Sequence, residues 1–312
     1  MIHAGPHTGR GPVEIKGTGD PPAARCDIVR VAMDSPNHVT RRSFLVSTAA
    51  LPVAFAAQQG SSIPIGLELY SVRDNLAKDL PGTLQAVGKM GYQVVEFYAP
   101  YMAWTPDRAK EVRAILDGTG MRCNSTHNGM DSFSAPSLPH AIELNHILGT
   151  HYLVLASPGK VKVLDDYRKV ADTLSRVQEN LKAEGLSAGY HNHDAEFRPL
   201  EGTRPIEIIA ANTPHDLMLQ LDVGTCVEAG SDPVAWIKAN PGRIRSLHLK
   251  DWSPALGYKA IFNEGSVPWQ KLLEAAESVG GVEYYLIEQE QSADPMATVQ
   301  ACLANYRKLR GA

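Results

Sequence analysis

The feature that most limits the possible folds is a regular alternation of short β-rich runs with longer helical segments after residue 62. The β-rich runs share a high content of apolar, aromatic and β-branched residues and lie at 65–70, 93–98, 122–127, 151–156, 186–191, 217–223, 244–250 and 284–289. The segments with helical periodicity lie at 79–90, 106–118, 164–184 and 232–239, and a closing helix is expected near 295–310. This alternation predicts parallel βαβ units.

Eight such units within about 250 residues favour a single α/β domain with the (β/α)8 TIM-barrel fold over residues 62–312. A doubly wound sheet is disfavoured because no GxGxxG motif follows the first β-rich run. No Pro-, Gly- or Ser-rich linker divides this part of the chain.

The first 57 residues have a different character. Residues 1–38 are rich in Gly and Pro and lack hydrophobic periodicity, so we expect them to be disordered. The run TRRSFL at 40–45 precedes the apolar run VSTAALPVAFAA and a small-x-small site at 54–56. This layout is typical of a twin-arginine export signal cleaved near Ala57. It predicts a periplasmic protein with no membrane span in its mature form, although a retained anchor and a true start at Met33 are alternatives.

The composition restricts the expected partners. A formal net charge of −4 and the absence of a basic run with interleaved aromatics argue against binding to nucleic acid. Four scattered cysteines, none in a CxxC pair, do not suggest a disulfide framework. We therefore expect a small molecule as the partner.

Ionisable residues gather at the carboxyl ends of the last four predicted strands, where TIM barrels place their active sites. Alternate side chains of a strand point to the same face. His191 and His193 therefore share a face, as do His248 and Lys250, and Glu288 and Glu290, while Asp222 ends the sixth strand. Two imidazoles and two carboxylates from these ends predict a divalent metal site with open positions for substrate oxygens. Manganese is the first expectation, and zinc, cobalt, iron and magnesium are alternatives.

The first three strand ends offer residues for the substrate pocket. We predict that Glu96 and His127, and more weakly Trp252 near the seventh strand, bind a sugar. Glu68 and the aromatic residues near these ends fit a pocket or a structural role equally well.

The motifs GLELYSVRD, GYQVVEFY, GYHNHDAEF, LQLDVG, SLHLKD, FNEGSVPW and YLIEQE resemble those of the xylose-isomerase-like TIM-barrel superfamily of sugar isomerases, epimerases and dehydratases. The resemblance extends from Ile63 to Arg310. In that family a metal is held by residues of strands five to eight, usually Glu, Asp, His and Glu. The resemblance implies the metal ligands His191, Asp222, His248 and Glu288 here.

One position departs from the family pattern, because His191 stands where many members have the first Glu. Ketose epimerases of this family exchange protons through two metal-bound glutamates, and only Glu288 remains here. A two-base reaction would need His193, Lys250 or a water molecule as the second base. The HNH-type strand is similar to that of relatives proposed to act on 3-keto-sugars and 3-keto-glycosides.

These observations predict a metal-dependent sugar isomerase or epimerase that acts by enolisation next to the carbonyl of a ketose or keto-sugar. Glu288 is the first candidate for the base and His193 the second, while Lys250 would stabilise the oxyanion or return the proton. The alternatives are a lyase or hydratase that acts on 3-keto-glycosides by β-elimination, and a non-catalytic periplasmic sugar-binding barrel. An AP endonuclease is disfavoured because Asp222 is followed by VGTC without the additional ligands. Homo-oligomerisation stays open.

Overall fold

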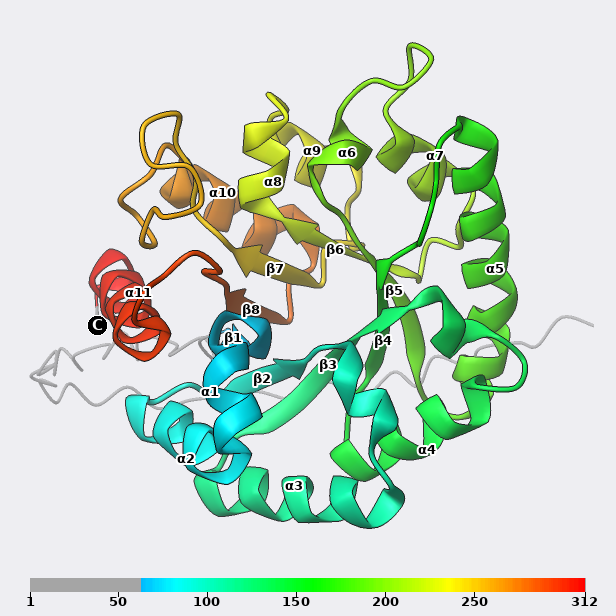
Figure 1. Cartoon of the computed structure of the whole chain (residues 1–312). Helices are drawn as coiled ribbons and strands as arrows, with labels where there is room; N and C mark the ends of the chain where they lie inside the picture. The colour runs from blue at the N-terminus through cyan, green and yellow to red at the C-terminus, as the bar shows by residue number, and fades with distance from the viewer. Residues whose placement is uncertain (1–62, 312) are drawn as a thin grey trace, which may run out of the picture. The chain divides into compact units, whose positions relative to one another are not determined.

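The computed structural model describes residues 63–311, which form a closed barrel of eight parallel strands in sequential order (Figure 1). The strands are β1 (Ile65–Glu68), β2 (Val94–Phe97), β3 (Arg122–Gly129), β4 (Tyr152–Ser157), β5 (Ser187–His191), β6 (Met218–Asp222), β7 (Ser246–Leu249) and β8 (Tyr284–Ile287). Pairing of β1 with β8 closes the ring. The predicted (β/α)8 barrel is confirmed, and every predicted strand overlaps an observed one.

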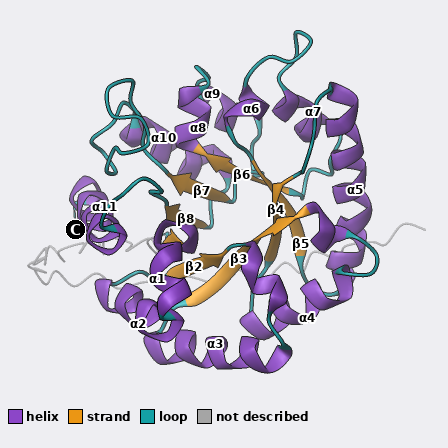
Figure 2. Cartoon of the chain, viewed as in Figure 1, coloured by secondary structure: helices purple, strands orange, loops and turns teal. Residues whose placement is uncertain are grey.

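The helices surround the barrel on the outside (Figure 2). The α-helices are α1 (Arg73–Lys78), α2 (Leu80–Met90), α3 (Pro106–Thr119), α4 (Leu138–Leu148), α5 (Leu164–Ala183), α6 (Asp194–Phe197), α7 (Pro205–Ala211), α8 (Val223–Glu228), α9 (Pro233–Ala239), α10 (Trp269–Ala275) and α11 (Pro295–Arg310). Short turns of other helix types are η1 (Leu69–Val72), η2 (Ala99–Ala103), η3 (Met130–Phe133) and η4 (Ala276–Gly280).

Local sequence signals set where these helices begin and end. Helices α3, α9 and α11 each begin with a proline at the first turn after a capping residue, which is Thr105, Asp232 or Asp294. The capping oxygen accepts a free backbone N–H, and proline needs no partner for the N–H that it lacks. Helix α2 ends at Gly91, whose φ of 97° is a conformation that glycine adopts without strain.

The barrel interior has an apolar half and a polar half. Val94, Val154, Met218 and Leu286 pack with the rings of Tyr152 and Tyr284 in a buried cluster of strand residues. The outward faces of the strands contact the helices in a second, larger core. Since the apolar cluster fills one part of the barrel, the ionisable residues at the carboxyl ends of the strands occupy the other.

The long segment that follows β7 is held by Asp251, which is buried. Asp251 Oδ2 accepts hydrogen bonds from the backbone N–H groups of Asn263 and Gly265 and from Trp269 Nε1, at 2.8, 3.1 and 2.8 Å. Asp251 Oδ1 accepts the N–H of Trp252 at 2.8 Å. The FNEGSVPW segment therefore folds around a single carboxylate.

The predicted disordered N-terminus and export signal at 1–57, with the periplasmic location that they imply, lie outside the described residues and stay predictions. None of the helices within 63–311 has the length and apolar composition needed to cross a lipid bilayer.

Replacement of Asp251 by Ala should lower the free energy of unfolding by about 2–4 kcal/mol, because it leaves several buried N–H donors without an acceptor. Asp107→Ala is the control. Asp107 pairs with Lys110 on the exposed face of α3, and its loss should change stability by less than about 0.5 kcal/mol. Urea unfolding followed by circular dichroism measures both, and an equal effect of the two variants would contradict this account of the β7 segment.

Candidate functional site

A cavity of about 460 Å³ lies at the carboxyl ends of the strands. Its ionisable lining residues are Glu68, His127, His191, His193, Glu288 and Glu290. A larger hollow of about 630 Å³ lies between α2 and α3, but it is lined by Gly88, Gly118, Ala114 and similar residues, with Lys89 as its one ionisable group. The chemistry therefore centres on the smaller cavity.

Three of the predicted ligands meet beside this cavity. Donor atoms of His191, Asp222 and Glu288 all lie within 4.8 Å of one another, and all three side chains are buried. His248, the fourth, is fully buried, and its Nδ1 lies 2.5 Å from Glu288 Oε2. The residues that the sequence assigned to one metal thus lie next to one another, on β5, β6 and β7 and directly after β8.

Glu96 lies beneath this cluster rather than on the cavity wall. Its side chain is fully buried, and its Oε2 lies 2.8 Å from His248 Nε2 and 3.1 Å from His127 Nε2. Burial alone would raise the pKa of the Glu96 carboxyl, but the positive charges and hydrogen bonds of these imidazoles outweigh burial and hold the pKa at about 2. A charged Glu96 orients His248 in the carboxylate–histidine arrangement that commonly supports metal ligands.

Gln220 joins the members of the cluster, and the sequence analysis did not single it out. Its Oε1 lies 2.7 Å from His127 Nε2 and 3.0 Å from His191 Nδ1, while its Nε2 donates to both oxygens of Glu96. The available signal was its position two residues before Asp222, which places both side chains on the same face of β6.

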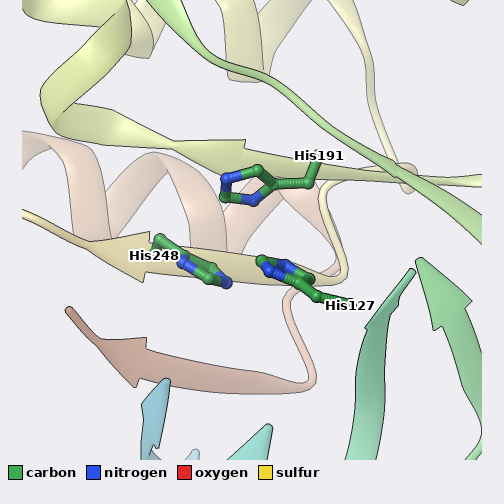
Figure 3. A group of neighbouring side chains, drawn as sticks. All are labelled: His127, His191 and His248. Carbon is green, nitrogen blue, oxygen red and sulfur yellow. The ribbon is translucent and has the colours of Figure 1, made fainter. Parts of the chain in front are cut away.

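The imidazoles differ in their tendency to hold a proton. Burial and the neighbouring imidazoles lower the pKa of His191 well below its ordinary value, and burial also lowers the pKa of His127. For His248 burial acts in the same direction, but Glu288 and Glu96 outweigh it and raise the pKa well above its ordinary value. Figure 3 shows these three rings gathered in one small region.

Asp222 and Lys250 form the side of the cluster away from the cavity. Asp222 Oδ1 accepts the backbone N–H of Thr225 and caps α8, while Oδ2 is buried and has no hydrogen-bond partner among the described residues. Lys250 Nζ lies 3.4 Å from Asp222 Oδ2 and 3.3 Å from Glu288 Oε1, and it also donates to Glu290.

A Cβ on Gly224 would lie 2.8 Å from the carbonyl oxygen of Lys250, so glycine is needed for this close approach of α8 to β7.

Two further carboxyl groups line the cavity. Burial and the negative charge of Glu288 raise the pKa of Glu290 to about 7. Burial and the negative charge of the nearby Glu96 raise the pKa of Glu68 well above its ordinary value. Glu68 Oε1 accepts the N–H of Tyr70, while Oε2 has no partner within residues 63–311.

The other predicted site residues are placed as follows. His127 and His193 line the cavity, and His193 is exposed. Lys250 does not line it and lies behind Glu288 and Glu290. Trp252 is half-buried at the start of the segment held by Asp251, away from the cavity lining. The structure thus brings donor atoms of His191, Asp222 and Glu288 together, with His248 in contact with Glu288, whereas Glu96 and Trp252 do not line the cavity.

Residues 84–306 match the family model described as xylose isomerase-like TIM barrel. The chain belongs to this family. A solved sugar phosphate isomerase/epimerase from Parabacteroides distasonis is similar over 81% of this chain and 97% of its own, with 25% identity and a TM-score of 0.65. No curated protein matches the sequence significantly.

Two more distant structures share the fold. The 3-keto-D-glucoside 4-epimerase from E. coli is 16% identical, with a TM-score of 0.59 over 79% of this chain and 99% of its own. The IolI protein, solved with a zinc atom, is 14% identical, with a TM-score of 0.61 over 79% of this chain and 97% of its own.

The cluster fits a divalent metal by its own chemistry. Asp222 Oδ2 is a buried carboxylate oxygen that lacks a hydrogen-bond partner among the described groups, and the nearest cation, Lys250 Nζ at 3.4 Å, is shared with two other carboxylates. His191 and Glu288 place donor atoms near it, and imidazole and carboxylate are the ligands that zinc, iron and manganese accept. The single ammonium of Lys250 already offsets part of the negative charge, but it contacts three carboxylates.

Asp222→Asn should weaken the binding of Mn²⁺ or Co²⁺ by more than the ~10–100-fold that loss of an outer partner of a ligand typically costs. Asn also caps helices, so the variant removes the charge and leaves the start of α8 intact. Calorimetric titration of the chelator-treated protein measures the affinity. Asp117→Asn, on the exposed face of α3, is the matched control. Equal affinities of Asp222→Asn and wild type would exclude Asp222 as a ligand.

Proposed function

We propose that this protein is a metal-dependent sugar isomerase or epimerase that moves a proton at the carbon next to the carbonyl of a ketose or keto-sugar. The observation that carries the proposal is the convergence of donor atoms of His191, Asp222 and Glu288 beside a cavity lined by carboxyl and imidazole groups. A volume of about 460 Å³ falls in the range of small-ligand sites.

His191, Asp222, His248 and Glu288 are the proposed metal ligands, with manganese as the first candidate. A bound divalent cation would act as a Lewis acid and stabilise the negative charge that develops on substrate oxygens when the α-proton leaves. Glu96 supports this arrangement through its contact with His248 Nε2, and this is the role that we now propose for Glu96 in place of direct sugar binding.

The walls of the cavity differ in chemistry. Its carboxyl groups lie on or directly after β1 and β8, as Glu68, Glu288 and Glu290, and its imidazoles lie on or directly after β3 and β5, as His127, His191 and His193. A sugar between these walls has carboxylates on one face and imidazoles on the other. A carboxylate–imidazole pair can thus take the place of the two glutamates used by ketose epimerases of the family.

The proton steps follow from this division. Glu288 is ionised, because the charges of Lys250 and His248 outweigh burial and hold the pKa of its carboxyl well below the ordinary value. We assign it the removal of the α-proton. His193, exposed on the facing wall, returns a proton to the opposite face or to the neighbouring carbon. Lys250 does not contact the substrate in this proposal. It lies outside the cavity lining, where its ammonium pairs with the carboxylates of Glu288 and Glu290.

A lyase that acts on 3-keto-glycosides is the second candidate. It shares the removal of the α-proton but then expels a β-substituent, so it needs one base and an exit for the leaving group. The presence of His191 in place of the usual glutamate supports this reading, because the proposed ligand set then has only two carboxylates, Asp222 and Glu288.

Incubation with ketoses and 3-keto-glucosides in D₂O tests both candidates. The metal-loaded wild type should exchange the α-proton, and Glu288→Gln should reduce the exchange rate by at least ~100-fold because it removes the base. His193→Gln should retain exchange and lose the epimerised product. NMR and mass spectrometry follow exchange and products.

Glu274→Gln, on the outer helix α10, is the control and should behave as wild type. Release of a leaving group from the 3-keto-glucoside would favour the lyase over the isomerase or epimerase. Sugar binding without exchange by any metal-loaded form would contradict the enzymatic proposal and favour a sugar-binding barrel.

A further inference from the structure

We propose that Gln220 is a positioning residue that fixes which nitrogen of His191 and which nitrogen of His127 carries the ring proton. The consequences for ligand binding rest on the proposed function, whereas the proton positions themselves are a property of the protein with or without a metal. Gln220 is buried in β6, and its amide lies between Glu96 on one side and the two imidazoles on the other.

The orientation of the amide follows from Glu96. An ionised carboxylate only accepts hydrogen bonds, so the group facing it must be the NH₂ of the amide. Gln220 Nε2 lies 3.0 and 3.1 Å from the two oxygens of Glu96 and 3.3 Å from Ser246 Oγ. The carbonyl oxygen of Gln220 consequently faces the imidazoles, and it has two lone pairs with which to accept from both.

The carbonyl oxygen of Gln220 determines which nitrogen of His191 is free to bind a metal. Its Nδ1 lies 3.0 Å from Gln220 Oε1 and must carry a proton to make this hydrogen bond. A neutral imidazole, the form that binds a metal, has a single N–H, so Nε2 of His191 keeps its lone pair. Gln220 thereby selects Nε2 as the atom that His191 offers to the cluster with Asp222 and Glu288.

In His127 the ring proton lies on Nε2, the opposite nitrogen from that in His191. Its Nε2 lies 2.7 Å from Gln220 Oε1 and 3.1 Å from Glu96 Oε2, and both of these oxygens are acceptors. The proton is therefore on Nε2, and Nδ1 is the acceptor of a ring that lines the cavity. His127 thus meets a substrate as an acceptor for a hydroxyl group and not as a donor.

His248 completes the arrangement around the same two side chains. Its ring is nearly parallel to that of His127, at 7° with centroids 5.0 Å apart, and its Nε2 lies 2.8 Å from Glu96 Oε2. The ring of His191 is tilted against both, with centroid distances of 4.5 Å (Figure 3). Each of the three imidazoles has one nitrogen engaged by Gln220 or Glu96, and His248 also contacts Glu288 through its Nδ1.

The residue type at position 220 matters because both halves of the amide are used. Glutamate would place a second carboxylate against Glu96 in a buried site, where the repulsion is costly. Methionine has a similar length but would leave the Glu96 carboxylate and two imidazole N–H groups short of partners. Glutamine donates to the carboxylate and accepts from the imidazoles at the same time.

Long-range ¹H–¹⁵N correlation spectra of histidine-labelled, metal-free full-length protein test the proposal directly. His191→Asn and His127→Asn assign the signals. In wild type we expect Nδ1–H on His191 and Nε2–H on His127. In Gln220→Met, His191 should populate both tautomers, and Co²⁺ affinity should fall ~10–100-fold, as expected for loss of an outer partner of a ligand.

Gln178→Met is the matched control. Gln178 is an equally buried glutamine on α5 that bonds the backbone N–H of Ala188 and the hydroxyl of Ser187, outside the cavity. Its loss should lower the melting temperature and leave the tautomers and the metal affinity unchanged.

An Nε2–H signal from His191 in wild type would overturn the proposal, and so would a Gln220→Met variant with unchanged tautomers. The wild-type spectrum tests the proposal even if the Gln220→Met variant fails to fold. Correct tautomers without any metal binding would contradict the proposed function but leave the role of Gln220 intact.

Discussion

The site depends on the burial of charge at one end of a closed barrel. Glu96 has no exposed surface, and a carboxylate in such a place is stable as an anion only when donors surround it. Gln220, His127 and His248 supply those donors from three other strands. The requirement to pair this one charge orients Gln220, His127 and His248, so the burial of Glu96 and the geometry of the site are linked.

The sequence predicted the barrel well because barrel strands and helices are defined by local signals. Apolar runs such as 151–156 can only be buried strands in this alternation, and Thr105-Pro106 or Asp294-Pro295 determine helix starts without reference to the rest of the fold. The proximity of the candidate ligands was also predictable. His191, Asp222 and Glu288 end consecutive or nearby strands, and parallel strands of a barrel end on the same side.

What the sequence did not predict are partnerships across the barrel. Gln220 is an ordinary strand residue by its pattern, and its importance appears only when Glu96, 124 positions earlier, lies beside it. Glu96 was expected on the cavity wall because it is close to a strand end, yet β2 places it one layer lower, under His248. A strand position gives the face of the side chain, but its depth depends on the register between strands, and the pairing of β2 with β3 shifts between Val95 and Glu96.

The replacement of the usual first glutamate by His191 also changes the charge of the cluster. Two carboxylates and two imidazoles balance the two charges of a divalent cation, whereas a third carboxylate would leave an excess negative charge. In the proposed function, the ligand set with His191 would therefore carry less negative charge and would polarise a substrate carbonyl more strongly. The same replacement removes a base from the β5 wall. Because an imidazole ligand uses its lone pair for the metal, the proposed function assigns the proton transfer on that wall to His193, whose ring is exposed and is not among the proposed ligands. In this proposal His191 and His193 divide between them the two roles that the family resemblance assigns to a single glutamate.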